Sequence, residues 1–112
     1  MSIEEKPCPK ECAKLLKALA EEMRLQILRC LFRGEHSVSE IAKELGEEHF
    51  RVSHHLGILR NTGLVVDKKE GKFVIYQIHP LIYKQFKRGR YKNTLDFKCC
   101  SIEFYNNRDK KP

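Results

Sequence analysis

Residues 37–61 read SVSEIAKELGEEHFRVSHHLGILRN, and this stretch decides the fold. Ser37, with Glu40 three residues later, predicts a capped helix start, because each side chain can bond the other residue's backbone N–H. Gly46 predicts the end of this short helix, since glycine readily adopts the left-handed conformation that follows a helix. A second helix is expected over residues 48–61, and its inward face carries three apolar residues at helical spacing: Val52, Leu56 and Leu59. Two helices joined by so tight a turn predict a helix-turn-helix.

The segments on either side extend this pair into a winged helix. Apolar residues recur at helical spacing over residues 12–19, and a further helix is expected from Glu21 until Gly34. After Gly63 the spacing of apolar residues changes from about 3.6 to about 2, which is typical of strands. Residues 64–78 are therefore expected to form a β-hairpin with a charged tip, which is the wing.

The C-terminal third is expected to hold one more helix and one strand. Pro80 begins a helix predicted over residues 81–88, which Gly89 ends. Apolar and polar residues alternate over residues 99–104, which predicts a short strand. Residues 106–112 are expected to be frayed. The expected fold class is mainly α with a small β-hairpin.

Three parts follow from this pattern. We expect an N-terminal extension over residues 1–11, a winged helix-turn-helix domain over residues 12–88, and a tail over residues 89–112 that carries a cysteine pair. A single domain of this size buries a modest share of its surface, which favours an oligomer.

Charge is unevenly distributed along the chain. Residues 1–50 carry 8 basic and 10 acidic side chains, a net charge of −2, whereas residues 51–112 carry 14 basic and 5 acidic, a net charge of +9. A basic half indicates an anionic partner, with nucleic acid the leading candidate and a solvated basic surface the alternative. The N-terminus lacks the pattern of a signal peptide and no apolar run is long enough for a membrane span, so we expect a cytoplasmic protein with no membrane partner. In that compartment the five cysteines are not expected to form a disulfide framework.

The second helix of the pair offers a polar outer face for base edges. Serine and histidine can read bases, and arginine can bind guanine or a phosphate. Lysines on the hairpin would contact a neighbouring phosphate or the minor groove. The alternative is a scaffold pair of helices with a solvated face. The predicted DNA-binding residues are His49, Phe50, Arg51, Ser53, His54, Arg60, Lys68, Lys69 and Lys72.

The chain resembles the ArsR/SmtB family of metal- and metalloid-responsive repressors over residues 12 to about 80. The most specific segments are LLKAL with RLQIL, VSEIAKELG, and VSHHLGILRNTGLV. The resemblance implies a homodimer built from the first and last helices. It also implies binding to double-stranded operator DNA without inducer, and release when an inducer binds. A two-fold dimer would bind an imperfect inverted repeat.

Two sensing sites of that family are missing here. Many members carry two cysteines at the start of the third helix, and the matching positions here are Ser37 and Ser39. Others bind zinc between the last helices through Asp, two His and Glu. This chain has no histidine after His79, and the helix expected there is short.

The remaining candidates for sensing are thiols. Cys99 and Cys100 are adjacent, Cys8 and Cys12 lie four residues apart, and some arsenic-sensing relatives are similar in carrying a C-terminal cysteine pair. Thiolates select soft ions, so we expect trivalent arsenic or antimony as the inducer and no obligatory cofactor. Open alternatives are a redox or persulfide switch, a Cd, Zn or Pb site of cysteines, and an inert pair. Cys30 is expected to be a small buried hydrophobe. No pattern here provides a nucleophile held by a base in a cleft, so an enzyme is not expected.

Overall fold

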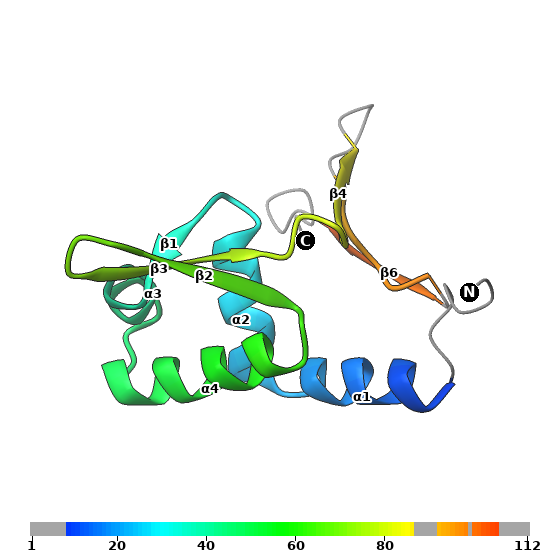
Figure 1. The fold of residues 1–112 in the computed structure, drawn as a ribbon, viewed down its shortest axis with the longest axis horizontal. Helices are drawn as coiled ribbons and strands as arrows, with labels where there is room; N and C mark the ends of the chain where they lie inside the picture. The colour runs from blue at the N-terminus through cyan, green and yellow to red at the C-terminus, as the bar shows by residue number, and fades with distance from the viewer. Residues whose placement is uncertain (1–8, 87–91, 99, 106–112) are drawn as a thin grey trace, which may run out of the picture.

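The computed structural model describes residues 9–86, 92–98 and 100–105. Helices gather beside a small sheet at one end, and a second small sheet stands at the other (Figure 1). The helices in the described part are α1 (Pro9–Leu19), α2 (Glu22–Leu31), α3 (Val38–Leu45) and α4 (His49–Asn61). The strands there are β1 (His36–Ser37), β2 (Val65–Glu70), β3 (Phe73–Ile78), β4 (Tyr83–Phe86), β5 (Lys92–Asp96) and β6 (Ser101–Tyr105).

The helix-turn-helix forms as the sequence predicts. The Glu40 backbone N–H donates to Ser37 Oγ at 3.1 Å, and the Ser37 N–H donates to Glu40 Oε1 at 2.8 Å, so the capping box is confirmed. Gly46 ends α3 with φ 67° and ψ 35°, in the left-handed region where glycine carries no steric penalty. These local features fix the angle at which α4 leaves α3.

The core lies between α2, α3, α4 and the first sheet. Its largest fully buried side chains come from the apolar stripes that the sequence predicted, and α4 contributes three of them with no exposed surface: Val52, Leu56 and Leu59. Ile27 and Leu28 of α2 are equally buried, and Cys30 is 2% exposed, as expected of a small hydrophobe. Burying one face of α4 so completely leaves its opposite face free to bind.

The first sheet contains the wing and has the strand order β1-β3-β2. Strands β2 and β3 pair antiparallel from Val65 with Ile78 to Glu70 with Phe73, so a two-residue turn joins them. Gly71 in this turn has φ 65°, a backbone conformation that suits glycine in tight hairpins. The predicted hairpin is confirmed.

The segment expected as the last helix is different. In place of a helix over residues 81–88, the chain makes a turn and then strand β4, which pairs antiparallel with β5 in a second sheet of order β4-β5-β6. The cause is non-local. The Tyr83 ring stacks on Phe32 at the end of α2, with centroids 5.5 Å apart, and the backbone of residues 83–86 bonds to β5. Residues 87–91 lie outside the described part.

The strand expected near the C-terminus is confirmed as β6, although it begins at Ser101 rather than at residue 99. Phe104 of β6 also packs on the Phe32 ring, with ring centroids 5.1 Å apart. Leu95 and Phe97 are buried against the core. The described fold therefore has two small sheets rather than a single hairpin. Within the described ranges, none of the helices has the length and apolar character needed to cross a bilayer.

Candidate nucleic-acid interface

Helix α4 separates an apolar face from a polar one. Its predicted base-reading residues all lie on the exposed side: His49, Phe50, Arg51, Ser53 and His54. Phe50 is 68% exposed in the first turn. Gly57 shares this outward face, and a Cβ built there would meet nothing within 4 Å. The result is an open polar surface with one large apolar side chain at its N-terminal end.

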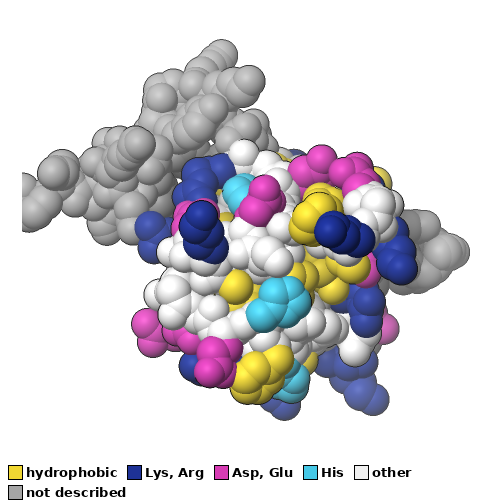
Figure 2. Space-filling model, turned by 90° about the vertical axis from the view of Figure 1, so that its left-hand side faces the viewer, with side chains coloured by type: hydrophobic (Ala, Val, Ile, Leu, Met, Phe, Trp, Pro, Cys, Tyr) yellow, Lys and Arg dark blue, Asp and Glu magenta, His cyan; other side chains and the backbone are white. Residues whose placement is uncertain are grey.

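The start of α4 and the tip of the wing lie at the same end of the molecule (Figure 1). Figure 2 looks onto that end and shows histidine and hydrophobic side chains among lysines, arginines and acidic residues. Phe73, at the wing turn, is 50% exposed, and the Lys72 ammonium lies 6.0 Å from its ring centroid. Helix and wing can therefore contact the same ligand.

Two of the predicted basic residues on α4 are already paired with carboxylates. Arg51 Nη1 lies 2.9 Å from Glu47 Oε1, one turn earlier, and Arg60 Nη1 lies 3.3 Å from Asp67 Oδ2 at the base of the wing. Both arginines are about half exposed. A phosphate ligand would have to compete with these carboxylates for the guanidinium groups.

The wing lysines are not equivalent. Lys68 Nζ lies 3.3 Å from Glu35 Oε1 and 3.4 Å from Glu70 Oε2, and both carboxylates raise the pKa of Lys68. Lys69 and Lys72 are exposed and take part in no ion pair within the described residues. We therefore expect Lys69 and Lys72 to be the more available phosphate contacts.

One contact that the sequence did not reveal joins α2 to α4. Arg24 of α2 donates from Nε to His55 Nδ1 at 3.2 Å and from Nη1 to the Ala18 carbonyl at 3.0 Å. Glu21 Oε1 lies 3.9 Å from His55 Nδ1. Burial lowers the pKa of His55, Glu21 raises it and Arg24 lowers it, with the net shift downward. Arg24 thus links the end of α1 to the middle of α4.

The cysteines are only partly described. Cys12 is buried in α1 and its sulfur is disulfide-bonded, whereas no disulfide framework was expected from the sequence. Cys100 is a free, half-buried thiol in the β5–β6 connection, where its carbonyl accepts from the Phe97 N–H at 2.9 Å. Cys8 and Cys99 lie outside the described residues. Burial is the main cause that raises the pKa of Cys30 to about 11, and Glu44 adds to it.

No metal site can be assigned from the described part of the chain. Within residues 9–86, 92–98 and 100–105, no three His, Cys, Asp or Glu side chains come together as a ligand set would. The sulfur site that the sequence predicts includes two undescribed residues and stays a prediction.

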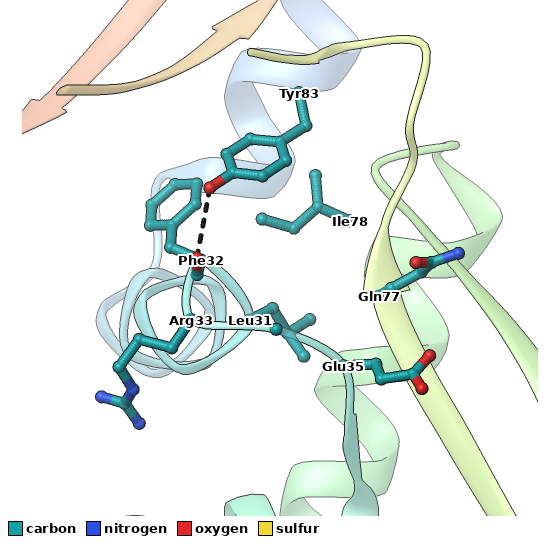
Figure 3. Close-up of a pocket in the computed structure, with 8 residues that line it drawn as sticks. Leu31, Phe32, Arg33, Glu35, Gln77, Ile78 and Tyr83 are labelled. Carbon is teal, nitrogen blue, oxygen red and sulfur yellow. Dashed lines mark hydrogen bonds between the residues drawn. The ribbon is translucent and has the colours of Figure 1, made fainter. Parts of the chain in front are cut away.

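A cavity of about 290 Å³ lies between the end of α2, β3 and β4 (Figure 3). Its apolar wall includes Leu31, Ile78 and the Tyr83 ring, and the Tyr83 hydroxyl donates to the Phe32 carbonyl at 3.2 Å. Arg33 points away from the cavity and pairs with Glu44 on α3. The charged groups near this cavity are occupied within the protein, so it does not present an evident ligand site.

Comparison with known proteins matches the region that contains the candidate interface. A family model described as bacterial regulatory protein, arsR family, matches residues 21–66, from α2 to the start of the wing. The arsenical resistance operon repressor of Escherichia coli is 40% identical over 70 residues, covering 62% of this chain and 60% of that protein. The chain spans 58–60% of the length of the curated relatives it matches at 40% identity or above.

Solved structures agree on the fold. The homodimeric winged helix-turn-helix DNA-binding domain of Mb0332 from Mycobacterium bovis has a TM-score of 0.60 and 38% identity over 62% of this chain and 65% of that one. Reduced HlyU from Vibrio cholerae has a TM-score of 0.60 and 41% identity over 62% of this chain and 74% of that one. The winged helix-turn-helix architecture is therefore shared with regulators rather than with an enzyme.

Proposed function

Because the chain belongs to the ArsR family of bacterial regulatory proteins, we propose that it is a transcriptional repressor that binds operator DNA as a homodimer. One observation carries this proposal. Helix α4 buries Val52, Leu56 and Leu59 completely while its opposite face is open beside the wing. A helix held in this way fits the major groove, with the wing on the flanking backbone. Such a protein works where the chromosome is, in the cytoplasm.

Helix α1 supports the dimer proposal. Its Leu16 is 40% exposed although it belongs to the apolar face, and Leu15 is half-buried. The resemblance implied pairing through the first and last helices, but β4 stands where that last helix was expected. We therefore assign the larger part of the dimer contact to α1. A two-fold dimer binds an inverted repeat with half-sites about 10 bp apart, and sedimentation equilibrium that shows only monomer at micromolar concentration, with and without DNA, would contradict it.

For the inducer we propose trivalent arsenic or antimony, bound by Cys99 and Cys100 with a further sulfur from Cys8, or from Cys12 once its disulfide is reduced. The relative in Escherichia coli is named for arsenical resistance. Cys100 precedes β6 instead of lying in it, so the rule that neighbouring strand residues point to opposite faces does not keep the pair apart. Soft trivalent ions suit two or three thiolates.

A redox or persulfide switch is the second candidate, and the bonded state of Cys12 favours it. Two thiols would lose two protons and two electrons to an external oxidant as their S–S bond forms. In that case the reduced and oxidised proteins differ in operator affinity without any metalloid. A Cd, Zn or Pb site of cysteines is the third candidate.

Fluorescence anisotropy with an operator duplex separates these candidates. The protein is reduced with a phosphine, and release is followed with arsenite, methylarsenite, antimonite, Cd²⁺, Zn²⁺, Pb²⁺, a persulfide and diamide. We expect the trivalent arsenicals to release the wild type and Cys30→Ala, the control, but not the Cys99→Ser, Cys100→Ser double variant. Release of the double variant at wild-type concentrations would refute the arsenic site. Release by diamide or persulfide alone would establish the second candidate.

A further inference from the structure

Phe50 is unusual among the predicted interface residues because its side chain is large and apolar but exposed. It is a large aromatic residue, 68% exposed, in the first turn of α4. Phe73, the other exposed phenylalanine at this end, has the Lys72 ammonium near its ring, whereas Phe50 has no ring contact within the described residues. A ring left in water at the start of a base-reading helix indicates a contact that forms only in a complex.

The neighbours of Phe50 define what that contact can be. Residues three, four and seven positions apart share a helix face, so Phe50 lies in line with Ser53, His54 and Gly57. Gly57 leaves open space beside this line, which permits close approach of DNA. Arg51, the next residue in the sequence, is paired with Glu47. The leading part of the helix therefore presents an apolar group flanked by small and polar ones.

The major groove offers one methyl group among its base edges, the C5-methyl of thymine, and apolar side chains recognise it. We propose that Phe50 determines sequence specificity by packing its ring on the methyl group of a thymine in each half-site. This inference rests on the proposed function, because it requires that α4 enters the major groove. Beyond that function, the inference assigns the base that is recognised, thymine, and the group that Phe50 contacts, the C5-methyl.

The experiment begins with a duplex selected from a random library by the wild-type full chain. Each thymine of that duplex is then replaced in turn by deoxyuridine, which removes the methyl group and leaves base pairing unchanged. We expect one position per half-site at which the replacement weakens wild-type binding about fourfold, the effect of burying one methyl group. The Phe50→Ala variant should bind the thymine and uracil duplexes equally well.

Phe73→Ala is the matched control, since it removes the same side chain from the wing at the same end of the molecule. It should keep the full thymine-to-uracil difference. The inference is overturned if no thymine is sensitive, or if Phe50→Ala retains the difference. It is also overturned if Phe73→Ala abolishes the difference. If the selection enriches no duplex at all, the proposed function itself fails, so the two failures are distinguishable. Phe50 and Phe73 are both exposed, so we expect the Phe50→Ala and Phe73→Ala variants to unfold at the wild-type temperature.

Discussion

The pair between Glu47 and Arg51 gives a sharp test of the interface. Replacing Glu47 with glutamine removes the carboxylate that lies 2.9 Å from the Arg51 guanidinium and leaves the shape of the side chain nearly unchanged. We expect operator binding to become tighter, because Arg51 no longer has to leave a partner before it reaches a base or phosphate. The variant also removes a negative charge near DNA, so a control for that charge is needed.

Glu48→Gln is that control. Glu48 is the neighbouring residue, is exposed, caps α4 without a side-chain hydrogen bond, and forms no ion pair within the described residues. The Glu48→Gln substitution therefore removes the same charge without releasing a cation from an ion pair. An exposed pair one helical turn apart stabilises by about 0.3–0.5 kcal/mol, so the gain of Glu47→Gln over Glu48→Gln should be about twofold for each protomer. For a dimer with two copies of α4 the factor becomes about fourfold.

Fluorescence anisotropy on the selected duplex measures this difference at low salt, where electrostatic contacts are strongest. The double variant Glu47→Gln, Arg51→Ala should lose the gain, because the released guanidinium is then absent. Equal affinity of Glu47→Gln and Glu48→Gln would refute the reasoning, and would mean that Arg51 stays away from DNA. If the double variant still binds the operator more tightly, the loss of the negative charge alone is the cause.

Three further outcomes follow from the described contacts. The lowered pKa of His55 means that the unfolded chain binds more protons, so the free energy of unfolding should fall as pH drops below about 6.5. A His55→Gln variant in urea titrations should lose part of this pH dependence, and an identical dependence would contradict it. Cys30, with its pKa raised to about 11, should resist iodoacetamide at pH 8 until the protein unfolds, as mass spectrometry would show. Ser37→Ala should destabilise the protein by about 1 kcal/mol, with exposed Ser39→Ala near neutral, and equal urea midpoints would argue against the capping box.

Local signals explain why the helix-turn-helix was predictable from the sequence. The Ser37 and Glu40 capping box, Gly46, and the stripe at Val52 and Leu56 act within one or two helical turns. Their geometry depends little on the rest of the chain, and the structure confirms each. The wing was predictable for a similar reason, since a two-residue turn sets its register.

Strand β4 was not predictable in this way. The apolar positions 81, 82 and 86 fit a short helix as well as a strand, and the flanking Pro80 and Gly89 favoured the helix. The strand is favoured by two non-local contacts: the pairing of Tyr83 with Leu95, and the stacking of Tyr83 on Phe32, 51 residues earlier in the chain. Contacts at such separations are absent from any local pattern.

The contacts of the candidate interface were also only partly predictable, depending on how far apart in the sequence the two residues lie. The Glu47 and Arg51 pair could have been found from sequence, since the two residues are four apart at a helix start. The pair of Lys68 with Glu35 joins segments 33 residues apart, and the contact of Arg24 with His55 spans 31. Only the fold brings these residues together. The sequence thus predicted residues that the structure places on the exposed side of α4 and on the wing, but not which of their cations are already paired with carboxylates.

The position of Arg24 bears on how an inducer could act on DNA binding. The start of α1 and strand β6 lie at the end of the molecule away from the wing (Figure 1), and Cys12 is six residues, or about 9 Å of helix, from Ala18. Arg24 holds the Ala18 carbonyl with one nitrogen and His55 of α4 with another. Movement of α1, whether caused by a bound metalloid or by a change at the Cys12 sulfur, would therefore act on a side chain that contacts α4. Since His55 and Phe50 belong to the same helix, Arg24 adds a polar connection between the thiol end and the base-reading end to the packing of α1, α2 and α4 in one core. We expect loss of its contact to His55 to weaken the coupling between the two ends without removing either site.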